Sequence, residues 1–256
     1  MPVRRLLIAP ALLAISLSSL LEAAAQHSSE RRARDAGSQR QSAVKGLITT
    51  RLSERQLRRW KAIARLVFAK DEAGLSLHPT LRGLWEWAES CPHAIYIELP
   101  DRGSYRGTGA GQFRLERFDP AGKRHVAVIR LRLSVIDSAA SDKTVAWANG
   151  FIPFFDLRRH ERYAEVLGHE LAHAQTILSD LRTAKLTYET VEQTNTLFTA
   201  YYLQRNGRPP GQQLKQRLIK RDSLLQKFEV IAQGIEEAVW RELINSQNVR
   251  AGSSRH

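Results

Sequence analysis

Two histidines and a glutamate at a fixed spacing are the residues of this chain best suited to chemistry. His169 and His173 enclose Glu170 in the pattern H-E-x-x-H. Residues four apart on a helix lie on one side, about one turn from each other, so both imidazoles can bind one zinc ion. Glu170 then lies beside the ion, where its carboxylate can take a proton from a water whose pKa the metal lowers to about 7. The alternative is a core helix with two solvated or hydrogen-bonded histidines.

The segment around this motif has the pattern of a helix with one packed side. At about 100° per residue, its apolar side chains fall on one face, opposite the two histidines. These side chains are Tyr163, Ala164, Leu167, Leu171, Ala174 and Leu178. The sequence therefore predicts a helix that packs with one face and presents both histidines on the other.

An extended apolar stretch, 143–155, precedes the motif helix and ends close to a proline. Together, Ala146 to Pro153 and Val166 to Ala174 resemble the gluzincin metallopeptidases, the clan of thermolysin, the aminopeptidases and the CAAX-processing proteases. The resemblance implies zinc-dependent hydrolysis of peptide bonds. It also implies that 143–155 is an edge strand along which an extended peptide lies. For this stretch alone, an ordinary buried strand is the alternative.

In gluzincins a glutamate on a later helix is the third zinc ligand, and the segment 187–204 has a helical pattern. It carries Glu189 and Glu192 in its first turns. Glu192 is the favoured ligand, because Glu189 has Lys185 four residues before it and is explained by a solvated ion pair. Glu189 stays the alternative.

The sequence departs from the family pattern beyond this glutamate. Several gluzincins place an aspartate four residues after the ligand to orient a zinc-bound histidine, and this chain has Thr196 there. Another residue must support the histidine, and Asn195 and Asp180 are candidates. The group that stabilises the oxyanion is unassigned, with three tyrosines as possible donors: Tyr188, Tyr201 and Tyr202.

The remaining segments predict the elements that position the motif. Helical periods begin at Ser53, which has capping-box spacing to Gln56, and at Pro79. Alternating patterns at 95–99, 113–117 and 126–130 predict strands, with a turn at 119–122. The segment 212–246 predicts one long helix, or two broken near Gly234, and Glu236 and Glu237 on it are expected far from the motif.

These elements predict a single α+β domain of zincin-like fold. It would hold a small, mostly antiparallel sheet, the H-E-x-x-H helix, the third-ligand helix and a C-terminal helical cover. The expected organisation is a signal peptide at 1–25, a disordered basic linker at 26–52, the metallopeptidase domain at 53–248 and a disordered tail at 249–256. The charged, apolar and small-residue regions of 1–25 follow the order of a secretory signal.

The amino-acid composition indicates which classes of partner the protein can bind. The net charge of +13 favours polyanions, and with an export signal these are anionic envelope polymers or lipid headgroups. The chain has no recognisable nucleic-acid-binding module, and after the signal no segment apolar enough to span a membrane. Its single cysteine, Cys91, excludes an intramolecular disulfide, so a hydrophobic core must supply the stability.

The expected function is that of a secreted or periplasmic zinc peptidase acting on peptides or proteins. His169, His173 and Glu192 would bind Zn²⁺, and Glu170 would act as general base. Two alternatives remain open. One is a catalytically silent zinc-binding envelope protein, and the other is an amidase or peptidase acting on peptidoglycan stem peptides.

The N-terminal pattern generates a first prediction. Export should remove residues 1–25, because the apolar run is about 16 residues and a bilayer span needs roughly 20. The intact mass of the secreted or periplasmic protein measures this directly. Recovery of the full-length chain in the membrane fraction would contradict it.

Overall fold

A computed structural model describes residues 46–49, 52–100, 110–139, 157–204 and 210–253 of the chain. The expected signal peptide and the stretch 143–155 lie outside these residues. Helices and a four-stranded sheet build an α+β fold. In chain order the elements are β1 (Gly46–Ile48), α2 (Glu54–Val67), α3 (Pro79–Ser90), β2 (Ala94–Glu98), β3 (Gly111–Arg117), β4 (Val126–Leu131), α4 (Leu133–Ala139), α5 (Arg159–Leu178), α6 (Leu181–Thr187), the π-helical turn η3 (Tyr188–Glu192), α7 (Gln193–Gln204) and α8 (Gln212–Ser253).

The sheet is mixed, with the strand order β1-β2-β4-β3. β1 pairs with β2 and β2 with β4 in parallel, and only β3 and β4 pair antiparallel. The expectation of a mostly antiparallel sheet was therefore wrong. Two helices, α2 and α3, connect β1 to β2, and a crossover of this kind returns the chain in the same direction. β3 lies at one edge of the sheet.

The ordered fold begins earlier than expected, within the segment that was assigned to a disordered linker. Gly46 starts β1, and its N–H donates to the carbonyl of His93 over 2.8 Å. Its φ is 74°, and a Cβ atom there would lie 2.5 Å from the carbonyl oxygen of Glu89, so only glycine fits. At the other end, α8 extends to Ser253, into the expected tail.

Most of the predicted local structure is confirmed. The Ser53 hydroxyl accepts from the N–H of Gln56, and the Gln56 side chain accepts from the N–H of Ser53, which completes the capping box of α2. α3 begins at Pro79. The N–H of Gly122 donates to the carbonyl of Asp119 and closes the predicted turn between β3 and β4. These features depend on neighbouring residues, which is why the sequence predicts them well.

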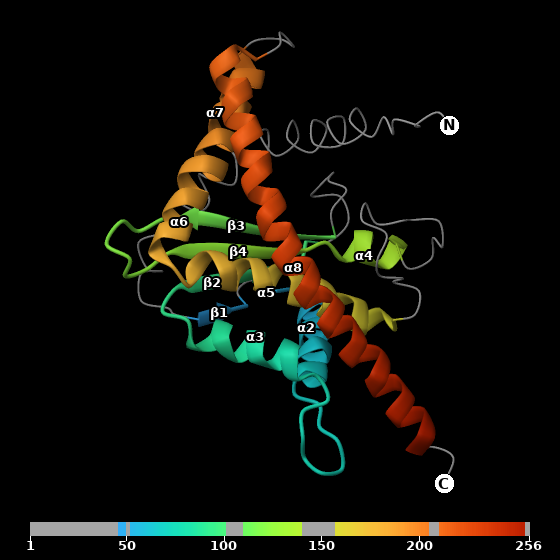
Figure 1. Cartoon of the computed structure of the whole chain (residues 1–256). Helices are drawn as coiled ribbons and strands as arrows, with labels where there is room; N and C mark the ends of the chain where they lie inside the picture. Colours follow the sequence, from blue (N-terminus) through green and yellow to red (C-terminus); the bar gives the residue numbers. More distant parts are fainter. Residues whose placement is uncertain (1–45, 50–51, 101–109, 140–156, 205–209, 254–256) are drawn as a thin grey trace, which may run out of the picture.

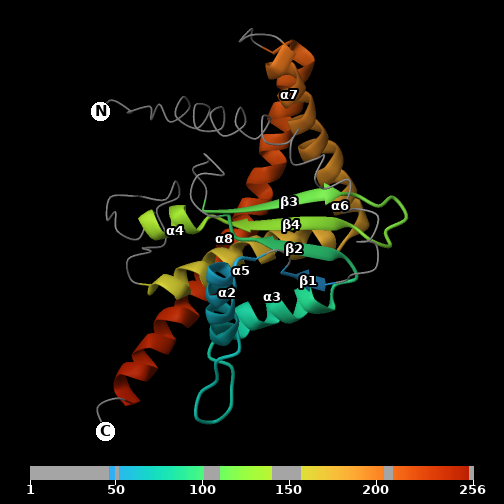
Figure 2. The same ribbon diagram turned by 180° about the vertical axis from the view of Figure 1, so that it is seen from behind.

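α5 is the central element of the fold. The six residues of its predicted apolar face are all buried. α5 packs on β3 and β4 on one side and on α8 on the other. The two helices lie in front of the sheet in Figure 1 and behind it in Figure 2, so the order of layers is sheet, α5, α8. No helix in the described ranges is long and apolar enough to cross a membrane.

α8 is a single helix of 42 residues that continues through Gly234. It crosses α5 at Gly168, where a Cβ atom would lie 3.2 Å from a methyl group of Val239. The absence of a side chain at Gly168 lets the helices approach closely. The side chains of Gln247 and Glu242 fix the angle of α8: Gln247 donates to Glu161 of α5, and Glu242 accepts from the N–H of Thr80 on α3.

A pair of buried histidines joins the β3–β4 turn to the rest of the sheet. The rings of His93 and His125 lie 4.4 Å apart, and Phe118 stacks on His125 at 5.0 Å. The ring nitrogen Nδ1 of His125 accepts from the N–H of Asp119, which requires that nitrogen to be unprotonated. Burial, and then the charge of a protonated His93, lower the pKa of His125 from 6.5 to about 4.

This pair generates a prediction for the pH dependence of stability. The unfolded chain binds a proton at His125 below pH 6.5, but the folded chain does so only near pH 4. The free energy of unfolding should therefore fall as the pH drops from 6.5 to 4, by up to about 3 kcal/mol. Urea denaturation across this range measures the effect, with His125→Gln as the comparison. Parallel pH profiles for the two proteins would show that His125 does not cause it.

Candidate metal centre

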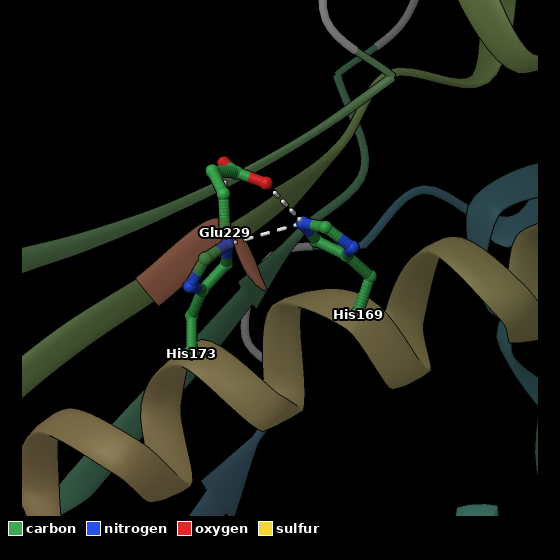
Figure 3. A group of neighbouring side chains, drawn as sticks. All are labelled: His169, His173 and Glu229. Carbon is green, nitrogen blue, oxygen red and sulfur yellow. Dashed lines mark hydrogen bonds and ion pairs between the residues drawn. The ribbon is translucent and has the colours of Figure 1, made fainter. Parts of the chain in front are cut away.

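Three side chains converge where α5 and α8 cross. The Nε2 atoms of His169 and His173 lie 3.0 Å apart. Glu229 of α8 lies against both, with one carboxylate oxygen 3.3 Å from His169 Nε2 and the other 3.5 Å from His173 Nε2. Figure 3 shows the glutamate reaching over the two imidazoles from the neighbouring helix. Together they are a group that could hold a metal ion.

The site is covered but not closed. The side chains of His169 and His173 are 15% and 11% exposed, whereas that of Glu229 is 48% exposed. Solvent therefore reaches the group from the side of Glu229.

A second glutamate of α8 fixes the orientation of His169. Glu236 accepts a hydrogen bond from His169 Nδ1 over 2.9 Å, which leaves Nε2 free to face His173 and Glu229. The expectation that Glu236 is far from the motif was wrong. Glu229 and Glu236 are seven residues apart, about two helical turns, so they lie on the same side of α8 and reach the same face of α5.

Charge within the group is balanced by close contacts. Burial opposes a charged His169, but hydrogen bonds to Glu229 and Glu236 outweigh it and raise its pKa to about 10. Burial also opposes a charged Glu229, yet hydrogen bonds to His169 and His173 hold its pKa well below the usual range. The positive charge of His169 on α5 and the negative charge of Glu229 on α8 therefore attract each other. A metal ion bound to His169 Nε2 would replace the proton on that nitrogen.

Glu165 adds a third carboxyl group behind the histidines. It lies four residues before His169 on α5 and is fully buried. Burial, and then the negative charge of Glu236, raise its pKa well above the usual range. Glu165 is therefore held as a neutral acid, because a second buried anion beside Glu236 would be strongly unfavourable.

Glu170, the predicted general base, lies on the side of α5 that faces the sheet edge. A Cβ atom at Gly111, the first residue of β3, would lie 2.3 Å from a carboxylate oxygen of Glu170, so only glycine leaves room for it. Burial raises the pKa of Glu170, and the neighbouring charges of His169 and His173 oppose that rise. A carboxyl group with a raised pKa holds a proton more readily, as a base in proton transfer must.

Glu192, the predicted third ligand, is not part of this group. Its carboxylate lies 3.4 Å from the guanidinium of Arg114 on β3 and faces the backbone N–H of Leu115. Glu192 ends the π-helical turn η3, which changes the direction of side chains relative to a regular helix. The structure brings Glu229 to the histidines instead. Glu189, the alternative, is half exposed and pairs with Lys185 at 3.9 Å, as the sequence predicts.

The proposed supporting residues also have other partners. The side chain of Asn195 accepts from Arg221, and Asp180 caps α6 by accepting from the N–H of Thr183. Neither contacts a histidine of the motif in the described structure, and Glu236 has that role. Tyr188 stacks on Phe118 at 5.8 Å, and the position of an oxyanion donor stays a matter of prediction.

The chain was compared with protein-family models, with curated proteins and with solved structures, and none of them matches.

The metal centre generates a prediction that separates the two glutamates. If the group binds zinc, Glu229→Ala should weaken that binding by more than about 100-fold, because it would remove one of the three candidate ligands. Glu192→Ala is the matched control and should change zinc affinity by less than about threefold, since Glu192 contacts Arg114. Competition with a chromogenic chelator measures both. A large loss with Glu192→Ala and none with Glu229→Ala would restore Glu192 as the ligand.

Proposed function

We propose that this protein is a zinc-dependent peptidase with a zincin-like fold. The observation that carries the proposal is the group of His169, His173 and Glu229, together with Glu170, whose charge interacts with both histidines. Bonds of about 2.0–2.1 Å to a tetrahedral zinc ion place neighbouring ligand atoms roughly 3.3 Å apart. The separations of 3.0 Å between the two imidazole nitrogens and 3.3 Å from His169 Nε2 to one oxygen of Glu229 are close to this spacing, and the other oxygen of Glu229 lies 3.5 Å from His173 Nε2.

Two imidazoles and one carboxylate are also the ligands of many catalytic zinc sites, which keep a fourth position open for water. A bound zinc ion would lower the pKa of such a water and polarise a substrate carbonyl. Glu236 would keep His169 in the tautomer that binds through Nε2. Because Glu165 is neutral, Glu236 can keep its negative charge and accept the hydrogen bond from His169.

Glu170 would carry the proton during hydrolysis. It takes a proton from the attacking water as the water oxygen bonds to the carbonyl carbon. It then gives that proton to the leaving nitrogen as the carbon–nitrogen bond breaks. The raised pKa of Glu170 suits both steps, because the carboxyl group must hold the proton between them.

The edge of the sheet at β3 is evidence for a peptide substrate. β3 is the last strand in the sheet order, and its first residue lies against Glu170. An extended peptide can add to such an edge through main-chain hydrogen bonds. The resemblance to gluzincins implies the same role for 143–155, which lies outside the described residues. Export of the enzyme belongs to the same proposal and depends on the N-terminal pattern alone.

The proposed mechanism predicts the effect of one substitution. Glu170→Gln should lower kcat for peptide hydrolysis by about 10²–10⁴-fold, because the amide keeps the shape of the side chain but cannot act as a base. The zinc content should stay near that of the wild type. A quenched fluorescent peptide library and metal analysis measure the two properties.

The control is Glu189→Gln, at an exposed position on η3 away from the group, which should leave hydrolysis unchanged. Full activity of Glu170→Gln would exclude Glu170 as the base. A wild-type protein that binds zinc but cleaves no peptide would instead favour the catalytically silent alternative.

A further inference from the structure

The main-chain hydrogen bonds of β3 show which of its residues face the outer edge. The N–H of Arg132 donates to the carbonyl of Ala110, and Gly111 is paired with Leu131. In an antiparallel ladder this makes Gly111–Leu131 a pair without mutual hydrogen bonds. The N–H and C=O groups of Gly111, and by alternation those of Phe113 and Leu115, therefore point away from β4. In the described structure β3 has no strand on that side.

The outer edge of β3 has the carboxylate of Glu170 near one end and that of Glu192 near the other. Glu170 lies against Gly111 at one end. At the other end Glu192 faces the N–H of Leu115 and so occupies the position where a further strand would form its next hydrogen bond. Four residues separate Gly111 from Leu115, which is roughly 14 Å of extended chain. Between these two carboxylates, the outer edge of β3 could form main-chain hydrogen bonds with about three residues of an added peptide.

The direction of an added peptide decides which of its ends meets Glu192. Antiparallel pairing is the more stable arrangement, and β3 runs from Gly111 toward Arg117. A peptide paired antiparallel to β3 runs the opposite way. If its scissile bond lies beside Glu170, the residues before that bond lie toward Leu115, and the amino-terminal side of the peptide reaches Glu192.

The surroundings of Glu192 favour a cation. Its side chain is 11% exposed, and the guanidinium that approaches it, that of Arg114, also lies 3.7 Å from Glu116. Two carboxylates thus share one guanidinium. Burial raises the pKa of Glu192, and Arg114 lowers it only in part. A second positive group at this place would stabilise the charged carboxylate.

We infer that Glu192 closes the substrate site at its amino-terminal end and binds the α-ammonium group of the peptide. Substrates are then free amino-terminal ends, and the bond that breaks lies about two to four residues from the terminus. This inference rests on the proposed function, since it takes Glu170 as the position of the scissile bond. It assigns to Glu192 a role in specificity in place of metal binding.

The test uses peptides with one cleavable core sequence, extended at the amino terminus by zero to six residues, each with a free or an acetylated terminus. The full-length, zinc-loaded protein should cleave near free termini, and acetylation should lower kcat/KM by at least about tenfold. Glu192→Gln should remove most of this preference. Glu189→Gln, three residues away and exposed, should keep it.

Several outcomes would overturn the inference. Cleavage at internal bonds regardless of the distance from the amino terminus would show that Glu192 does not close the site. Equal rates for free and acetylated peptides would show that the α-ammonium is not bound. Sensitivity to amidation of the carboxyl terminus instead would show that the peptide runs parallel to β3, with its end at Arg114.

A binding measurement separates this inference from the proposed function. Zinc-loaded Glu170→Gln is titrated with peptides that carry a fluorophore at the carboxyl end. Suppose that the wild type cleaves nothing, yet peptides with a free amino terminus bind at least about tenfold more tightly than acetylated ones, and Glu192→Gln abolishes this difference. The amino-terminal binding site is then supported and the proposed peptidase activity is wrong. If no peptide is cleaved and none binds, both are wrong.

Discussion

The close crossing of α5 and α8 is the contact on which the rest of the site depends. Gly168 lets Val239 approach the backbone of α5, and Glu236 and Glu229, three and ten residues before Val239 on α8, reach the histidines. A larger side chain at Gly168 would push α8 outward and separate the ligands by the same displacement. Packing of the two helices therefore also brings the three side chains of the candidate metal centre together.

α5 is unusual in the number of acids that it buries. Glu161, Glu165 and Glu170 all lie within the protein, each in a different environment. Glu161 caps the helix and accepts from Gln247, Glu165 is neutral beside Glu236, and Glu170 lies against Gly111 at the edge of the sheet. Buried carboxyl groups are costly unless they are paired or protonated. On α5 the cost is met differently at each position, by a hydrogen bond at Glu161 and by a raised pKa at Glu165 and Glu170.

Local patterns predicted the capping box of α2, the β3–β4 turn and the packed face of α5, because each depends on residues close in sequence. The contact of Glu229 with the histidines could not be predicted in this way, since it is set by the angle at which α8 crosses α5. The π-helical turn before α7 also displaced Glu192 from its expected direction. One signal was present: Glu229 and Glu236 lie seven residues apart and therefore on the same side of one long helix. β1 is too short, at three residues, for any alternating pattern.

The long α8 also has a topological consequence. His169 and Glu229 are 60 positions apart in the sequence, and an ion bound between them would close that span into a loop. Such a closure restricts the unfolded chain much as a disulfide does, and the entropic gain grows with loop length. With Cys91 as its single cysteine, the chain has no internal disulfide to perform this task. Its resistance to unfolding would then follow the concentration of free metal rather than the redox state of its surroundings.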